Sequence, residues 1–239
     1  MANFFEYFPQ VSYKFGNEKT PDVFQNLSVY ADVIDQVKDS KSLYTDYVVP
    51  EGERPDQTSV KLYGTPTYHW TFFLLNDKLR EQGWPLSNTE ARNYAIRKYP
   101  NDVITTRTAL TSLTGFFKTG DIVTGRTSGV SSEILHRNLD LGQIIVKGNF
   151  LPSENIETSG TTDLVTVQSV SKQFNSAHHY KNTSGRVDID PTVGPGASLT
   201  EVTYTDRVIS QNNNLKQISV FKPGDINEVV KSFREAVTF

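Results

Sequence analysis

Two adjacent histidines, His178 and His179, are the residues of this sequence best placed to suggest a metal site. Imidazole nitrogens are common zinc ligands, and a structural zinc ion usually has four protein ligands. Neighbouring residues of a strand point to opposite faces, so both rings reach one metal ion only where the strand is bent. The chain has no cysteine, and no third ligand lies nearby in the sequence. We therefore expect no metal, with one histidine buried and hydrogen-bonded and the other exposed.

A second candidate for chemistry is the run of residues 120–127, which differs at one position from a phosphate-binding P-loop. Arg126 stands where that motif has lysine. A P-loop follows a strand and opens a helix whose N–H groups hold the phosphate. Here Ser128-Gly129 and a β-type sequence follow instead. A β turn explains the two glycines, and we expect no nucleotide or other cofactor.

Catalytic groups are not indicated either. The sequence has no Gly-x-Ser-x-Gly motif, and without cysteine it has neither a thiol nucleophile nor disulfide bonds. Its carboxylates form no pattern that identifies an acid–base pair. We predict that the chain is not an enzyme and has no small-molecule substrate.

Charge and hydropathy limit the remaining partners. The net charge is −3, and lysine and arginine are spread along the 239 residues, so no basic face for nucleic acid is indicated. No apolar run is long enough to cross a bilayer, and the N-terminus lacks the pattern of a secretory signal. The chain contains 14 phenylalanines and 11 tyrosines, which serve first as core residues and also as anchors of protein interfaces.

The first 43 residues are predicted to form an N-terminal arm and connector. Aromatic residues are concentrated in residues 2–15, which carry more apolar surface than a free tail exposes to water. This surface either packs on the protein's own core or docks on a neighbouring subunit, and both interpretations are open. Residues 21–37 mix strand and helix periodicities, and we expect a strand followed by a short helix.

Residues 44–100 are predicted to form a helical unit that begins with one strand. Tyr47 and Val49 have the spacing of a short strand with one buried face. Pro55 suits the first position of a helix, and Gly64 supplies the left-handed residue that ends it.

Two further helices are expected in this unit. Residues 68–75 are apolar on nearly every side, which indicates a short helix buried all round. A loop follows Asn76, and then Ser87 and Glu90 form a capping box for a helix that ends before Pro100.

Residues 101–172 are predicted to form an inserted small β domain, because their composition shifts to Thr, Ser, Gly and Val with frequent turn signals. Residues 115–123 recur as residues 148–156, which is a repeat at an offset of 33 residues. An isolated hairpin is not stable in water, so two related β units predict a barrel-like domain or a pair of packed hairpins.

Residues 173–239 are predicted to return to the helical unit as a strand pair and a helix. The strands comprise residues 201–209 and 217–221, and a turn at residues 212–214 lies between them. From Asp225 onward, apolar residues recur with helical spacing.

One long-range contact is expected from these elements. Ile218 and Val220 should pair with the strand at residues 47–49, which otherwise has no partner after Asn76. The predicted fold class is thus α+β: a strand-helix-helix unit with a third helix, an inserted barrel-like β domain, and a C-terminal strand pair with a helix.

The motifs around the first two helices give the sequence a family resemblance. A strand, a helix ending in Tyr-Gly and a helix ending in Asn resemble the LysM module. The fuller set resembles baseplate wedge protein 53 of T-even-like contractile-tailed phages. Its members are Phe4-Phe5-Glu6-Tyr7-Phe8-Pro9, Gly52-Glu53-Arg54-Pro55-Asp56, Leu62-Tyr63-Gly64, His69-Trp70, Asn76, Trp84-Pro85-Leu86-Ser87 and Ala177-His178-His179-Tyr180.

The resemblance implies a structural subunit of the virion tail baseplate, assembled in the host cytoplasm, that binds other wedge proteins and joins neighbouring wedges around the tail hub. Hub or sheath-initiating proteins are further candidate partners. The alternative is a peptidoglycan-binding LysM module of a tail-associated protein. The interface candidates are Phe4, Phe5, Tyr7, Phe8, Glu53, Arg54, Asp56 and Phe233.

Overall fold

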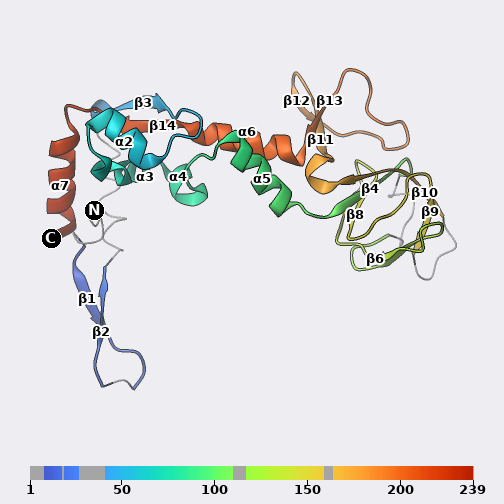
Figure 1. Ribbon diagram of the computed structural model, residues 1–239, viewed down its shortest axis with the longest axis horizontal. Helices are drawn as coiled ribbons and strands as arrows, with labels where there is room; N and C mark the ends of the chain where they lie inside the picture. The colour runs from blue at the N-terminus through green and yellow to red at the C-terminus, as the bar shows by residue number, and fades with distance from the viewer. Residues whose placement is uncertain (1–7, 18, 27–40, 110–116, 159–163, 239) are drawn as a thin grey trace. The chain divides into compact units, whose positions relative to one another are not determined.

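The computed structural model groups the chain into two compact units. Unit 1 comprises residues 1–88 and 212–239, and unit 2 comprises residues 89–211. The predicted α+β class is confirmed, since helices are combined with several small sheets (Figure 1). The LysM-like arrangement and the division into four segments remain predictions. The structure describes residues 8–17, 19–26, 41–109, 117–158 and 164–238.

Unit 1 is built from short elements. Its elements are β1 (Gln10–Tyr13), β2 (Asp22–Gln25), the 3₁₀ helix η2 (Lys41–Leu43), β3 (Tyr44–Val48), α2 (Pro55–Tyr63), the 3₁₀ helix η3 (Pro66–Tyr68), α3 (Trp70–Leu75), α4 (Asp77–Gln82), β14 (Gln217–Phe221) and α7 (Ile226–Thr238). The loop expected after Asn76 is wrong, because α4 begins there. The short helix expected within residues 21–37 lies outside the described residues.

Local signals set the limits of α2. Pro55 is its first residue, and the Arg54 N–H donates to the Gln57 side chain at 3.0 Å, which satisfies one of the donors that a helix start leaves free. Gly64 has φ +74° and its N–H donates to the Val60 carbonyl, so the helix ends where glycine adopts the left-handed conformation. The predicted helix is confirmed.

The expected long-range strand pair is also confirmed. β14 pairs antiparallel with β3 (Figure 1). In this register Ile218 lies opposite Tyr47. The free side of β14 is closed by a side chain instead of a strand. Asn76 Nδ2 donates to the Ser219 carbonyl at 2.8 Å, and the Ser219 N–H donates to Asn76 Oδ1 at 2.9 Å. One buried amide thus bonds as a neighbouring strand would.

The core of unit 1 joins the N-terminal and C-terminal parts of the chain. One cluster contains Phe8, Trp70, Leu74, Phe221, Ile226, Val229, Val230, Phe233 and Val237. A second contains Val49, Phe72, Leu79, Leu215, Ile218 and Val220. The apolar stripe of α7 therefore packs inside its own unit.

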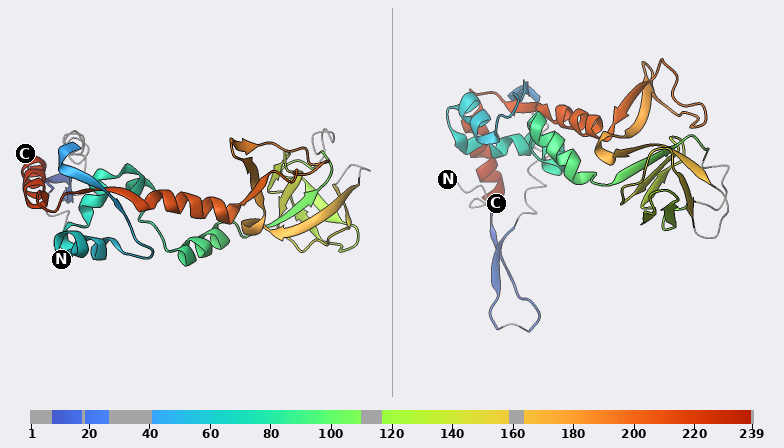
Figure 2. Two further views of the ribbon diagram at one scale, coloured as in Figure 1. Left: turned by 90° about the horizontal axis from the view of Figure 1, so that it is seen from above. Right: turned by 45° about the vertical axis from the view of Figure 1, so that its right-hand side comes forward.

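Unit 2 contains an antiparallel sheet in the order β6-β5-β9-β10-β4-β8-β7 and a smaller sheet in the order β12-β11-β13. Figure 2 shows the strands of this unit in green, yellow and orange. Its elements are α5 (Asn88–Lys98), β4 (Asp102–Thr106), β5 (Ile122–Gly125), β6 (Ser131–Glu133), β7 (His136–Asn138), β8 (Gln143–Val146), β9 (Asn155–Thr158), β10 (Val165–Lys172), the 3₁₀ helix η4 (Gln173–Asn175), β11 (Ala177–Asn182), β12 (Gly185–Val187), β13 (Thr200–Thr203) and α6 (Tyr204–Lys216). α5 begins at the unit boundary and α6 ends in unit 1.

The larger sheet is not a closed barrel, so that part of the prediction is wrong. Its two edge strands are β6 and β7, which the chain joins through Ile134 and Leu135. The Ile134 N–H donates to the Asp121 carbonyl and the Leu135 N–H donates to the Ile145 carbonyl. These two N–H groups therefore bond to the segment before β5 and to β8. β6 and β7 do not pair with each other, so the sheet remains open.

The repeat seen in the sequence corresponds to repeated structure. β5 and β9 lie 33 residues apart along the chain and pair with each other. The turns before them match: the Lys118 N–H donates to the Asp121 carboxylate, and the Leu151 N–H donates to the Glu154 carboxylate. Both copies contribute a phenylalanine, Phe117 and Phe150, to the core of unit 2.

The strand predicted over residues 201–209 is confirmed at residues 201–203, which belong to β13. Its remainder and the turn at residues 212–214 are wrong, because α6 begins at Tyr204. The Thr203 N–H donates to the Asp206 carboxylate, and the Asp206 N–H donates to Thr203 Oγ1, both at 3.0 Å. This reciprocal cap is a helix-start signal that the sequence analysis missed.

Candidate interaction site

The hairpin formed by β1 and β2 exposes an apolar face. Val11 lies opposite Phe24, and Tyr13 lies opposite Asp22, so these residues share one face of the ribbon. Tyr13 and Phe15 are 59% and 50% exposed, and Phe24 is 45% exposed. Three rings form a surface cluster, with centroids 4.9 Å apart between Tyr13 and Phe15 and 5.8 Å apart between Phe15 and Phe24.

This exposure is unfavourable, because a two-stranded ribbon needs to pack its apolar face against another element to be stable. Isolated hairpins are only marginally stable in water, and a contiguous apolar patch on a soluble protein marks an interaction surface. We call Val11, Tyr13, Phe15 and Phe24 the hairpin face. From the sequence, the aromatic residues of segment 2–15, which include Tyr13 and Phe15, were predicted to pack on the core or dock on a neighbouring subunit. Phe24 was missed, although the alternation of Val11, Tyr13 and Phe15 signals a strand that requires a partner.

Two of the sequence-predicted interface residues lie in the core of unit 1. Phe8 is 4% exposed and Phe233 is 1% exposed, and their rings meet edge to face with centroids 6.5 Å apart. Neither side chain is available at the surface of the folded unit, so we remove both from the candidate set. Phe4, Phe5 and Tyr7 lie outside the described residues.

Glu53 holds together the start of α2 and the segments beside it. Its carboxylate accepts hydrogen bonds from the Thr58 hydroxyl at 2.7 Å and from the Tyr47 hydroxyl at 3.2 Å, and it pairs with Lys61 at 3.3 Å. Its carbonyl accepts from Trp84 Nε1 at 2.7 Å. Burial, reinforced by the Glu53 charge, raises the pKa of Tyr47. These contacts give Glu53 a structural role.

Arg54 and Asp56 lie at the surface and pair with each other. The Arg54 guanidinium donates to both carboxylate oxygens of Asp56, each at 3.1 Å. Their side chains are 72% and 42% exposed, so this bidentate pair contributes little to stability and is open to a partner. Both residues therefore remain interface candidates.

The two adjacent histidines are both half-buried and lie together, so the expectation of one buried and one exposed histidine is wrong. The register of β11 against β13 shifts between Ala177 and His179, and this bulge brings the two Nδ1 atoms within 3.0 Å. The Arg207 guanidinium lies 2.6 Å from His178 Nε2. Burial, and then the charges of Arg207, His179 and Arg186, lowers the pKa of His178 to about 4, so His178 is neutral at pH 7. Burial and the Arg186 charge also lower the pKa of His179.

The P-loop-like run binds one of the protein's own carboxylates. The Thr127 and Ser128 N–H groups and the Ser128 hydroxyl donate to Glu154 Oε2 at 3.3, 3.0 and 2.9 Å. A Cβ on Gly125 would lie 2.5 Å from that oxygen, so only glycine allows the carboxylate to approach. Residues 122–125 of the run form β5, and residues 126–127 begin the turn toward β6, so a β turn follows as the sequence indicated. Glu154 takes the place of an anion at this turn.

We predict that Glu154 makes unit 2 sensitive to acid. Burial disfavours the ionised form, but the N–H groups of Leu151, Ser128 and Thr127 and the Ser128 hydroxyl together outweigh it, so the pKa of Glu154 lies below its ordinary value. A depressed pKa in the folded state stabilises the fold above the ordinary value of about 4.5, and this stabilisation is lost as pH falls through the lowered pKa. Glu154→Gln is expected to cost about 1–3 kcal/mol at pH 7 and to flatten the acid dependence.

Urea titrations followed by far-UV circular dichroism, from pH 7 down to pH 3, would measure both effects. Glu157→Gln is a matched control, because Glu157 makes an ion pair at 2.7 Å with Arg126, whose side chain is 55% exposed. Equal stability of the Glu154→Gln and Glu157→Gln variants at pH 7 would contradict the assignment.

The described residues offer little else that points to chemistry. Within them, no cluster of three or more His, Asp or Glu side chains is placed to hold a metal ion. No helix in the same part of the chain is both long and apolar enough to traverse a bilayer.

Part of the chain matches a known family. Residues 3–106 match the family model for base plate wedge protein 53. No curated protein matches the chain. The matched range contains the hairpin face, Glu53, and the Arg54–Asp56 pair.

Proposed function

We infer, from the match of residues 3–106 to base plate wedge protein 53, that the chain is a structural subunit of a phage tail baseplate. The family description indicates a wedge protein, which is a tail component of the virion and assembles with other baseplate components. It also indicates a non-enzymatic role. We propose further that the chain binds other wedge proteins directly and helps to join neighbouring wedges around the tail hub.

The hairpin face is the observation that supports this proposal most strongly. Its aromatic residues lie inside the matched range and are about half exposed. Buried aromatic residues supply most of the binding energy in many protein interfaces. A neighbouring wedge protein with an apolar surface would cover the face and remove its rings from water. The exposed Arg54–Asp56 pair provides a second, polar contact for the rim of such an interface.

We predict that polar substitution of the hairpin face prevents assembly. The triple variant Tyr13→Ser, Phe15→Ser, Phe24→Ser removes the three-ring cluster, and each aromatic anchor at a protein interface contributes about 2 kcal/mol or more. Binding should weaken by about 30-fold or more. Co-expression with the remaining wedge proteins of the same phage, followed by native mass measurement of the complex, would show the loss.

The other face of the hairpin supplies the control. Gln10 lies opposite Gln25, and Ser12 lies opposite Val23. The variant Gln10→Ser, Val23→Ser, Gln25→Ser changes the same number of positions in the same two strands, and it should assemble. Full assembly of both triple variants would exclude the hairpin face as the contact. Removing residues 1–15 is a poorer test, because it also removes Phe8 from the core.

A further inference from the structure

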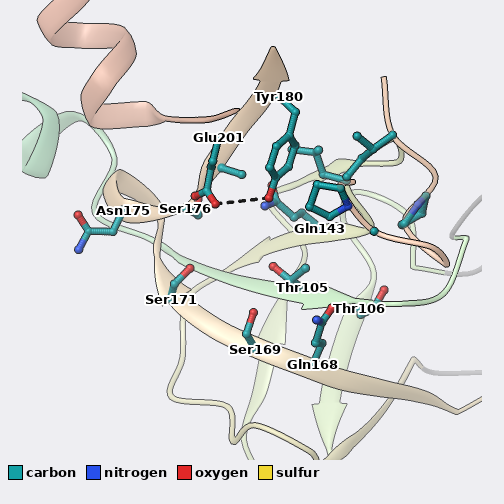
Figure 3. Close-up of a pocket in the computed structure, with 16 residues that line it drawn as sticks. Thr105, Thr106, Gln143, Gln168, Ser169, Ser171, Asn175, Ser176, Tyr180 and Glu201 are labelled. Carbon is teal, nitrogen blue, oxygen red and sulfur yellow. Dashed lines mark hydrogen bonds between the residues drawn. The ribbon is translucent and has the colours of Figure 1, made fainter. Parts of the chain in front are cut away.

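Unit 2 contains a cavity of about 350 Å³ between its two sheets (Figure 3). Strands β4 and β10 of the larger sheet line one side, and β11, β13 and the segment that contains Ile189 and Pro195 line the other. Its volume lies in the range of small-molecule sites. Nothing in the proposed baseplate role uses this cavity.

The chemistry of the lining is polar but almost uncharged. More than half of the lining residues carry a neutral hydroxyl or amide group, and Figure 3 shows Thr105, Ser169 and Ser171 on the strands below the cavity. Glu201 is the one charged residue among the described residues that line it. Without a lysine, arginine or histidine in the lining, the cavity is unsuited to phosphate, sulfate or carboxylate ligands.

Local backbone features give the cavity its shape. The register of β10 against β4 shifts between Val167 and Ser169, and this bulge turns both Gln168 and Ser169 toward the cavity. β-bulges often re-aim side chains next to binding sites. On the opposite wall, a Cβ on Gly142 would lie 2.9 Å from the Pro191 side chain. Glycine at this position therefore allows the segment that contains Pro191 to lie against the larger sheet and cover the cavity.

One buried group in the lining has no partner. Gln143 lines the cavity and is 4% exposed, and its Oε1 accepts no hydrogen bond from the residues that the structure describes. A buried acceptor without a donor is costly, and such groups are rare in folded proteins. A rotation of the Gln143 side chain that turns Oε1 into the cavity would let a ligand hydroxyl donate a hydrogen bond to it. The Tyr180 hydroxyl, which donates to Glu201 at 3.4 Å, adds a weakly held polar group on the opposite wall.

We propose that this cavity binds a neutral sugar residue of an oligosaccharide. A sugar hydroxyl both donates and accepts hydrogen bonds, as do the serine, threonine and glutamine side chains of the lining. The C–H faces of a sugar ring need apolar contact, and Leu141, Ile189 and the Tyr180 ring supply it. The absence of cationic side chains among the described lining residues selects neutral over acidic sugars.

Binding of the full chain to an array of glycans would test the proposal. The array would carry oligomers of glucose, galactose, mannose and N-acetylglucosamine beside sialylated and sulfated glycans. At least one neutral glycan is expected to bind, with weaker binding to its acidic counterparts. Absence of binding to every neutral glycan, or preference for acidic ones, would overturn the proposal.

Three variants would locate the binding. Gln143→Leu keeps the side-chain volume and removes the amide, so affinity should fall by about tenfold or more while the fold loses no stability. Ser169→Phe should block the cavity. Ser131→Phe is the matched control, because Ser131 is also an exposed strand serine but lies in β6, outside the lining. Equal affinity of all three variants would refute the site.

Failure of this proposal would be distinguishable from failure of the proposed baseplate role. The triple variant of the hairpin face is expected to bind the glycan normally, because that face belongs to unit 1 and the cavity to unit 2. Ser169→Phe is likewise expected to leave binding to other wedge proteins unchanged.

Discussion

Replacing Phe233 with alanine is expected to lower the free energy of unfolding of unit 1 by about 3–5 kcal/mol, the usual cost of deleting a buried ring. The Phe233 ring is 1% exposed and lies 4.8 Å from the Trp70 ring between centroids. The cavity left behind would remove the contacts of this ring with the Trp70 and Phe8 rings. Trp70 and Trp84 are the only tryptophans of the sequence, and both belong to unit 1, so urea titration followed by tryptophan fluorescence reports this unit.

Glu235→Ala provides the control on the same helix. The Glu235 side chain is 62% exposed, and its ion pair with Lys231 spans 3.9 Å, so the change should alter stability by less than about 0.5 kcal/mol. If Phe233→Ala instead kept the unfolding midpoint and weakened binding to wedge proteins, Phe233 would be a contact residue and its assignment to the core would be wrong.

Replacing Asn76 with alanine is expected to cost unit 1 about 2–4 kcal/mol, because it leaves buried backbone groups without partners. The Asn76 amide donates to the Phe72 and Ser219 carbonyls, each at 2.8 Å, and accepts from the Ser219 N–H at 2.9 Å. The side chain therefore joins the end of α3 to the free side of β14. Asn76→Asp should be at least as harmful, since a carboxylate would face two carbonyl oxygens.

The same fluorescence titration measures this effect. Asn213→Ala is the matched control, because Asn213 is exposed on α6, and alanine favours a helix over asparagine by a few tenths of a kcal/mol. An Asn76→Ala variant as stable as the Asn213→Ala variant would show that water satisfies Ser219 and that the amide has no structural role.

These two predictions share a consequence for the matched family region. Phe233 and Ser219 lie outside residues 3–106, yet they complete the core and the sheet of unit 1. The matched residues therefore need the C-terminal segment to fold. A fragment that ends at residue 106 is expected to be unstable, and it is not a suitable substitute for the full chain in assembly experiments.

Local chemistry was enough to predict several elements from the sequence. The proline at the start of α2 and the glycine after it act within one turn of the helix, so the sequence alone sets both ends. The apolar stripe of α7 and the strand β14 follow from periodicity in the same way. Even the pairing of β14 with β3 was predictable, because a half-buried strand without a neighbour requires one.

Other features depend on contacts that no short stretch of sequence contains. Three features arise where segments distant in the sequence meet. They are the open sheet of unit 2, the bulge that brings the His178 and His179 rings together, and the burial of Phe8 beside Phe233. An aromatic residue has the same side chain in a core as in an interface, so only the packing around it decides its role. The sequence by itself determined which residues are apolar and where α2 and α7 begin. The tertiary structure decided which apolar residues remain exposed, because burial is a property of the whole fold.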